Sequence, residues 1–137
     1  MLTEIISGLW IGDITDAFNE RFYKDNLINI VINCTLDQEF INLPNINKTR
    51  IPLSSNLTPE RDMSLLKNNM DSILTYIHKN IEINNILIFC YTGNTVSGLI
   101  VALYMIKYGD ISIEHIFEIL RSKNENICLD FDLSSFL

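Results

Sequence analysis

One stretch of sequence decides the fold: Ile86-Leu87-Ile88-Phe89-Cys90-Tyr91-Thr92-Gly93-Asn94-Thr95-Val96-Ser97-Gly98. It opens with an apolar run too short for a helix, passes through a cysteine and a small polar loop, and leads into a long apolar segment. This order predicts a strand, a loop and a helix. Such a loop directs backbone N–H groups and a helix N-terminus at one point, which attracts an anion. The cysteine at its mouth is the candidate nucleophile.

Length and composition describe one globular domain over residues 1–137. The chain is 47% hydrophobic and 20% charged, with a formal net charge of -7. This acidic balance argues against nucleic acid or an anionic membrane as the main partner. The three cysteines lie far apart without a C-x-x-C pair, so we expect neither a disulfide framework nor a metal site. A reducing compartment fits best, and we expect a cytoplasmic protein, with the nucleus as an alternative.

The pattern of apolar residues predicts strands that alternate with helices along the chain. The expected strands are Glu4–Ile6 and Leu9–Ile11 as an edge hairpin, Ile28–Cys34, Arg50–Leu53 and one from Ile86. The expected helices are a short one from Thr15 or Asp16 to Asn26, a long one from Thr58 past Ile77, Ser97–Tyr108, Ser112–Arg121 and a last turn in Asp130–Leu137. This order predicts an α/β fold with a central, mostly parallel sheet of about five strands flanked by helices.

Each expected helix has an apolar face that should pack on the core. In the long helix this face contains Met63, Leu66, Met70, Ile73, Leu74 and Ile77. In the last full helix we expect Ile113, Ile116, Phe117 and Leu120 to point inward, and in the first short helix Ala17, Phe18 and Phe22. The stretch Leu36–Lys48 has no period and contains a proline, so a loop is expected there.

These elements resemble, almost from end to end, the dual-specificity (cysteine-dependent) protein phosphatases. Ile6–Gly12 resembles the opening hairpin of that family, Ile32–Thr35 the end of its second core strand, and Leu103–Met105 the helix behind its active loop. The family signature is His-Cys, five residues, then Arg and Ser or Thr. The same frame here contains Phe89-Cys90, five residues, then Val96-Ser97. The resemblance implies a compact dual-specificity-phosphatase-like fold.

The resemblance also implies a role for each signature position. In the family the Cys attacks phosphorus as a thiolate, the Arg binds the phosphoryl oxygens, and the His orders the loop and lowers the pKa of the thiol. The Ser or Thr eases departure of the thiolate. Cys90, Gly93 and Ser97 are retained in this chain, whereas Phe89 stands at the His position and Val96 at the Arg position.

A separate Asp of the family, on its own loop upstream, protonates the leaving oxygen. Alignment of that loop puts Leu57 at the Asp position, and a one-residue slip would put Asn56 there. Neither side chain can donate a proton as a carboxylic acid does. Loss of the acid costs on the order of 10² to 10⁴ in rate and loss of the Arg on the order of 10² to 10³, so a combined drop of about 10⁴ follows even without additivity.

The sequence therefore predicts a pseudophosphatase that uses no cofactor. None of the catalytic positions is expected to function, and Cys90 is a vestigial nucleophile. Without the His and the Arg charge, the pKa of its thiol should return toward that of a free cysteine, or rise above it if the thiol is buried. The apolar side chains of Phe89, Val96 and Leu57 are then expected to surround the sulfur.

Other residues could compensate for these losses, and each also has a simpler interpretation. Arg50 or Arg61 could stand in for the missing guanidinium, although a solvated side chain is the simpler expectation for both. Asp62 could act as a relocated acid, but it is expected inside the long helix. His78 and His115 are expected at the surface of helices, away from the loop.

The loop itself leaves one further possibility open. Its backbone N–H groups from Cys90 to Ser97 remain, so weak binding of an anion is compatible with the sequence. The competing interpretation, which we favour, is that Val96 and Phe89 fill the space with apolar packing. Cys34 and Cys128 are most simply small core residues.

Four functions remain in order of preference. The leading hypothesis is a protein-binding or regulatory module of signalling, whose partner is a kinase, a phosphoprotein or an active phosphatase. The second is a residual or altered phosphatase with a relocated Arg or acid, and the third is a reader of phosphorylated residues. A structural role, including a homodimer through an exposed apolar face, is the fourth.

Overall fold

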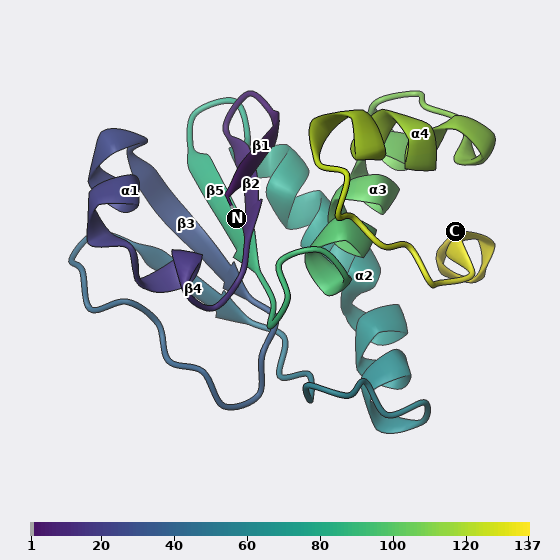
Figure 1. Cartoon of the computed structure of the whole chain (residues 1–137), viewed down its shortest axis with the longest axis horizontal. Helices are drawn as coiled ribbons and strands as arrows, with labels where there is room; N and C mark the ends of the chain where they lie inside the picture. Colours follow the sequence, from purple (N-terminus) through teal and green to yellow (C-terminus); the bar gives the residue numbers. More distant parts are fainter. Residues whose placement is uncertain (1) are drawn as a thin grey trace.

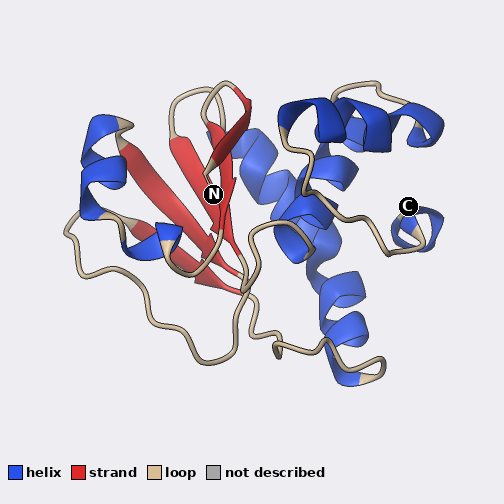
Figure 2. Cartoon of the chain, in the orientation of Figure 1, coloured by secondary structure: helices blue, strands red, loops and turns tan. Residues whose placement is uncertain are grey.

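A computed structural model describes residues 2–137, and residue 1 of the predicted domain lies outside the described part. Five strands form one mixed sheet, with helices on both of its faces (Figures 1 and 2). The strands are β1 Thr3–Ile6, β2 Leu9–Gly12, β3 Ile28–Asn33, β4 Asn47–Arg50 and β5 Asn85–Phe89. The helices are η1 Asp16–Phe18, α1 Glu20–Asp25, α2 Arg61–Asn80, α3 Val96–Tyr108, α4 Ile113–Lys123 and η2 Leu133–Phe136, of which η1 and η2 are 3₁₀ helices.

The sheet confirms the predicted topology. Its strand order is β1-β2-β5-β3-β4. Only the hairpin of β1 and β2 is antiparallel, and the other three pairings are parallel. The strand β5 therefore lies in the middle, between β2 and β3, where both of its edges are hydrogen-bonded. A parallel strand with both faces covered needs an unbroken apolar run, and Ile86–Phe89 supplies it.

Side chains of β5 alternate between two hydrophobic clusters, one on each face of the sheet. Ile86, Ile88 and Cys90 belong to the larger cluster, which contains α2 and α3. Leu87 and Phe89 belong to the smaller cluster, which contains η1 and α1. Cys90 is thus placed on the α3 side of the sheet by strand geometry alone.

The two predicted core helices are confirmed. All residues of α3 from Val96 to Met105 are buried, and the helix ends at Gly109, whose N–H donates to the Met105 carbonyl at 2.9 Å. The apolar stripe of α2 is buried from Leu66 to Ile77, and Met63 at its start is half-buried. No helix among residues 2–137 has the length and apolar character that crossing a bilayer requires.

Several predicted boundaries were wrong. The strand expected at Arg50–Leu53 lies at Asn47–Arg50, because those residues pair in register with the end of β3. The loop before it is correspondingly shorter than Leu36–Lys48. The long helix begins at Arg61 and not at Thr58, and Glu60 occupies its N-cap position.

The first short helix is divided into η1 and α1. Neither Thr15 nor Asp16 caps α1; Asn19 does so, because its side-chain oxygen accepts the N–H of Phe22 at 3.2 Å. Phe18 and Phe117 were expected to be buried, but each is 44% exposed. The ring of Phe117 instead lies 5.3 Å from the guanidinium of Arg121, a cation–π arrangement at the surface of α4.

Candidate functional site

The loop between β5 and α3 packs against the end of β2 through Gly93. This residue has a φ of 78°, in the left-handed region. A Cβ at this position would lie 2.8 Å from the backbone nitrogen of Asp13 and 2.9 Å from the carbonyl carbon of Gly12. Both contacts are with backbone, which cannot move aside as a side chain can. A glycine is therefore required twice here, by its φ and by the space available.

Hydroxyl groups surround the sulfur of Cys90. The Oγ of Ser97 lies 3.3 Å from Sγ, the Oγ1 of Thr95 3.8 Å, and the Oγ1 of Thr92 3.9 Å. The two threonine oxygens are 3.0 Å apart and share a hydrogen bond. Cys90 as a whole is only 2% exposed. The sulfur is therefore enclosed by hydroxyl groups of its own loop and almost closed to solvent.

The pKa of the Cys90 thiol differs from the prediction. Burial raises it, but hydrogen bonds from the Ser97 side chain and from the backbone N–H groups of Ser97, Thr95 and Gly93 together lower it below its ordinary value. The prediction that it would return to the free value or above was therefore wrong. The reason is that the Ser97 hydroxyl and the loop N–H groups donate to the sulfur and stabilise the thiolate without the His or the Arg.

The cavity above the Cys90 sulfur is very small. Its volume is about 30 Å³. A cavity of about 10–15 Å³ on this measure already holds one water molecule, so there is room for one or two waters, whereas a phosphoryl group brings a phosphorus atom and three oxygens. The residues that line the cavity are Cys34, Ser54, Ser55, Leu57, Cys90, Tyr91, Thr92, Thr95 and Val96.

Two of the three substituted positions line this cavity. Val96 is 3% exposed and packs in the larger hydrophobic cluster. Leu57 is half-buried and has a φ of 47°, again in the left-handed region. Both therefore place apolar groups beside the sulfur, as the sequence predicted.

Phe89 does not face the sulfur. It is fully buried on the opposite face of the sheet, in the cluster that contains Phe22 and Tyr23. The prediction that Phe89 surrounds Cys90 was wrong, because consecutive residues of a strand point to opposite faces. Any effect of this position on the cysteine must pass through the backbone.

Asp62 is a buried carboxylate that holds the loop before α2. It accepts the N–H of Ser54 at 3.2 Å and the N–H and hydroxyl of Thr58 at 2.6 and 3.0 Å. It also accepts the Ser54 hydroxyl and forms an ion pair with Arg61 at 2.6 Å. Burial raises its pKa, but these hydrogen bonds outweigh burial and lower the pKa to about 2. Asp62 is therefore ionised at neutral pH and has no proton to donate.

Neither arginine considered as a substitute faces the cavity. The Nη1 of Arg50 donates to the Thr35 carbonyl at 2.8 Å, and its guanidinium lies 5.1 Å from the ring of Phe40. The guanidinium of Arg61 is engaged by Asp62. Neither side chain belongs to the lining of the small cavity.

The two histidines lie at the surface, as expected. The ring of His78 stacks on Tyr108 with centroids 3.8 Å apart, and the Nδ1 of His115 lies 2.6 Å from the Oγ of Ser112. Within residues 2–137, no group of three or more His, Cys, Asp or Glu side chains is arranged to hold a metal ion.

Sequence reasoning missed part of the site. Cys34 follows β3 directly, donates its N–H to the Phe89 carbonyl at 2.9 Å, and lines the cavity with Cys90. Cys128 was expected in the core but is half-buried, and its S–H donates to Asp130 at 3.3 Å. Cys34 and Cys90 are neighbours because Asn33 of β3 lies opposite Phe89 of β5. The sequence alone does not supply this strand register.

Comparison with known proteins supports the fold. A search of curated protein sequences found no match. Among solved structures, DUSP15 matches with a TM-score of 0.84 at 20% identity, over 98% of this chain and 83% of that one. Human DUSP28 matches with a TM-score of 0.83 at 15% identity, over 98% and 88%.

A third similar structure is the human tyrosine phosphatase-like serine/threonine/tyrosine-interacting protein. Its TM-score is 0.82 at 12% identity, over 98% of this chain and 91% of that one. At such low identities these likenesses show a shared fold. Residues 9–137 match the sequence model of one protein family, described as the dual specificity phosphatase catalytic domain. The chain therefore belongs to the dual specificity phosphatase catalytic-domain family.

Proposed function

We propose that this domain is a catalytically inactive member of its family that acts as a protein-binding or regulatory module. The observation that carries this proposal is the filled space above Cys90. Three hydroxyl groups lie within 3.9 Å of the sulfur, and the remaining cavity is about 30 Å³. Thr92 and Thr95 line this cavity, and their side chains would have to rotate away before a phosphoryl group could reach the thiolate.

The chemistry around the sulfur supports the same conclusion. Val96 offers no hydrogen-bond donor from its side chain to phosphoryl oxygens, and Leu57 offers no proton to a leaving oxygen. The carboxylate of Asp62, the relocated acid considered from the sequence, is ionised and fully engaged. With both groups absent the rate should lie on the order of 10⁴ below that of an active family member.

The proposed partner is a protein: a kinase, a phosphoprotein or an active phosphatase. One of the similar structures is named as a phosphatase-like, interacting protein, so the fold occurs in a protein described by its interactions. The acidic chain, with a formal net charge of -7, disfavours nucleic acid as the partner. The proposed location is the cytoplasm or the nucleus, where three free cysteines are stable.

One observation favours a second candidate, a residual phosphatase. The lowered pKa of Cys90 leaves more thiolate at neutral pH than an unassisted buried thiol would have. The thiolate fraction of Cys90 is therefore higher than the absence of the His and the Arg would predict. For this candidate the hydroxyls of Thr92 and Thr95 would have to rotate away on substrate binding.

Hydrolysis of an aryl phosphate separates the two candidates. The purified chain is compared with its Cys90→Ser variant and with an active family member under the same conditions. We expect the chain to show no turnover above that of Cys90→Ser, and therefore a rate at least about 10⁴-fold below the active enzyme. Turnover that the serine substitution abolishes would establish a functioning nucleophile and refute the proposal.

A further inference from the structure

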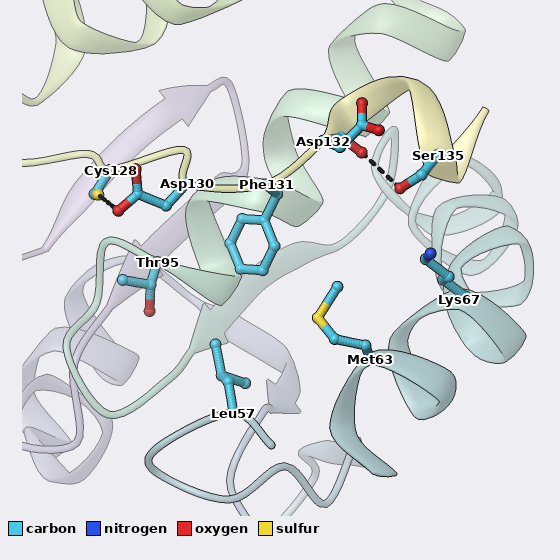
Figure 3. Close-up of a pocket in the computed structure, with 9 residues that line it drawn as sticks. All are labelled: Leu57, Met63, Lys67, Thr95, Cys128, Asp130, Phe131, Asp132 and Ser135. Carbon is cyan, nitrogen blue, oxygen red and sulfur yellow. Dashed lines mark hydrogen bonds between the residues drawn. The ribbon is translucent and has the colours of Figure 1, made fainter. Parts of the chain in front are cut away.

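A much larger pocket, called the hollow below, adjoins the small cavity beside Cys90, which is called the cradle. It lies between the start of α2 and the C-terminal segment 128–136, and its volume is about 490 Å³ (Figure 3). This is within the range of pockets that accept drug-sized ligands, about 300–1,000 Å³. Leu57, Met63 and Phe131 supply its apolar lining, and each is only half-buried. Figure 3 shows the ring of Phe131 and the thioether of Met63 directed toward each other across the hollow.

Two carboxylates stand on the C-terminal side of this hollow. Asp130 accepts the S–H of Cys128 at 3.3 Å, and Asp132 accepts the Ser134 hydroxyl at 2.6 Å. Both aspartates are exposed. Among the ion pairs formed within residues 2–137, none involves either of them. Two negative charges therefore lie beside apolar surface without a cation.

The one lysine of the lining does not neutralise them. The ammonium of Lys67 lies 5.8 Å from the centre of the Phe136 ring, a cation–π contact on the α2 side of the hollow. The lining thus has an acidic side, an apolar centre and a single cation already in contact with an aromatic ring. This distribution of charge is complementary to a ligand with an apolar group next to a positive charge.

We propose that the hollow binds a peptide segment of a partner protein in which a large apolar side chain stands beside a lysine or arginine. The apolar side chain lies among Leu57, Met63 and Phe131, and the cation pairs with Asp130 and Asp132. The inference rests on the proposed function, because it names the surface and the kind of segment by which the module would hold its partner.

Leu57 connects this hollow with the cradle. It lines both cavities, as does Thr95. Its backbone is left-handed, with a φ of 47°, which costs roughly 1–2 kcal/mol for a residue with a Cβ. The side chain of Leu57 is nevertheless kept at the border of the two cavities. A peptide in the larger hollow would therefore lie next to the mouth of the filled cradle.

The test begins with a random dodecapeptide library displayed on phage and selected on the immobilised full chain. We expect enrichment of peptides that carry Leu, Met, Phe or Ile within about two positions of Lys or Arg. The most enriched peptide is then synthesised with a fluorescent label, and its Kd is measured by polarisation. Enrichment of acidic peptides, or of peptides without a cation, would overturn the proposal.

Matched variants then locate the binding. The double variant Asp130→Asn and Asp132→Asn removes two charges with little change of shape, and we expect about tenfold weaker binding of the labelled peptide. The control is Glu114→Gln with Glu118→Gln, which makes the same change in net charge on the exposed side of α4 and should leave the Kd unchanged. Equal loss in both double variants would show a general charge effect and overturn the assignment.

Methionine methyl groups supply an independent readout that needs no substitution. In a chain labelled with ¹³C at these methyls, addition of the peptide should shift the Met63 signal. Met70 and Met105 are 2% and 7% exposed in the core and should stay in place. If the Met63 signal moves with protein concentration alone, a second copy of the chain covers the hollow and the proposal is wrong.

The outcome is independent of the test of the proposed function. If the chain binds the peptide and also hydrolyses phosphate through Cys90, the proposed peptide site is supported and the proposal of an inactive module is refuted. If the chain neither binds the peptide nor hydrolyses phosphate, the proposal that the domain is inactive stands and the proposed peptide site is refuted.

Discussion

A chain that carries both Val96→Arg and Leu57→Asp is expected to hydrolyse an aryl phosphate about 10⁴-fold faster than the unmodified chain. The arginine would restore a bidentate, charge-assisted donor for the phosphoryl oxygens. The aspartate would restore a proton donor at a position that already lines the cavity. Cys90 keeps its lowered pKa through the Ser97 hydroxyl and the loop N–H groups, so the nucleophile itself needs no substitution. Steady-state kinetics with a fluorogenic aryl phosphate measure the gain.

The structure predicts that Phe89→His is not needed for this gain. Phe89 is fully buried among apolar side chains on the far face of the sheet, where an imidazole would bring unpaired polar atoms and lower the free energy of unfolding. Addition of Cys90→Ser to the double variant is the control and should abolish its turnover. If activity emerged only when Phe89→His was added, the proposed role of the loop backbone would be wrong.

Substitution of Gly93 by alanine is expected to lower the free energy of unfolding by about 3 kcal/mol. Roughly 1–2 kcal/mol follows from the φ of 78°, which an L-residue adopts with strain. A further 1–3 kcal/mol, roughly, follows from relief of the contacts at 2.8 and 2.9 Å with the backbone of Asp13 and Gly12. The corresponding fall in Tm is roughly 10 °C, which thermal unfolding followed by circular dichroism measures.

Gly98→Ala is the matched control for that substitution. Its new Cβ would lie 3.2 Å from the Cγ2 of Ile127, a side-chain atom that can move. Gly98 is inside α3, where alanine gains about 1 kcal/mol of helix propensity. We therefore expect a change within about 1 kcal/mol of zero. Equal destabilisation by both substitutions would mean that the loop does not depend on the special backbone of Gly93.

The sequence was sufficient to predict most of the fold because the signals were local and strong. The unbroken apolar run Ile86–Phe89, the stripe of α2 and the buried α3 each follow from spacing alone. The strand β4 was misplaced because Asn47–Arg50 is polar, and its pairing with β3 decides its position. Phe117 was misplaced because helical spacing does not distinguish a core contact from a surface cation–π contact.

The candidate site was predictable in its residues but not in its chemistry. The retained Cys90 and the substituted Val96 follow from the signature, and the substituted Leu57 follows from the alignment of the acid loop. The lowered pKa of Cys90 depends on the Ser97 hydroxyl, which belongs to the signature, and also on where three backbone N–H groups point, which no side-chain pattern encodes. The role of Asp62 depends on a loop that folds back onto the first turn of α2. Both are consequences of backbone geometry, so sequence reasoning could not reach them.

Binding of tungstate, a tetrahedral oxyanion of phosphate-like shape, tests most directly whether the cradle is closed to phosphoryl groups. Isothermal titration calorimetry would compare the unmodified chain with Val96→Arg. Each charge-assisted bond contributes about 1.5–3 kcal/mol, so we expect the variant to bind at least about tenfold more tightly, and the unmodified chain to show no saturable heat at millimolar tungstate. Saturable binding by the unmodified chain, competed by phosphate, would contradict a cavity that Thr92 and Thr95 close to phosphoryl groups.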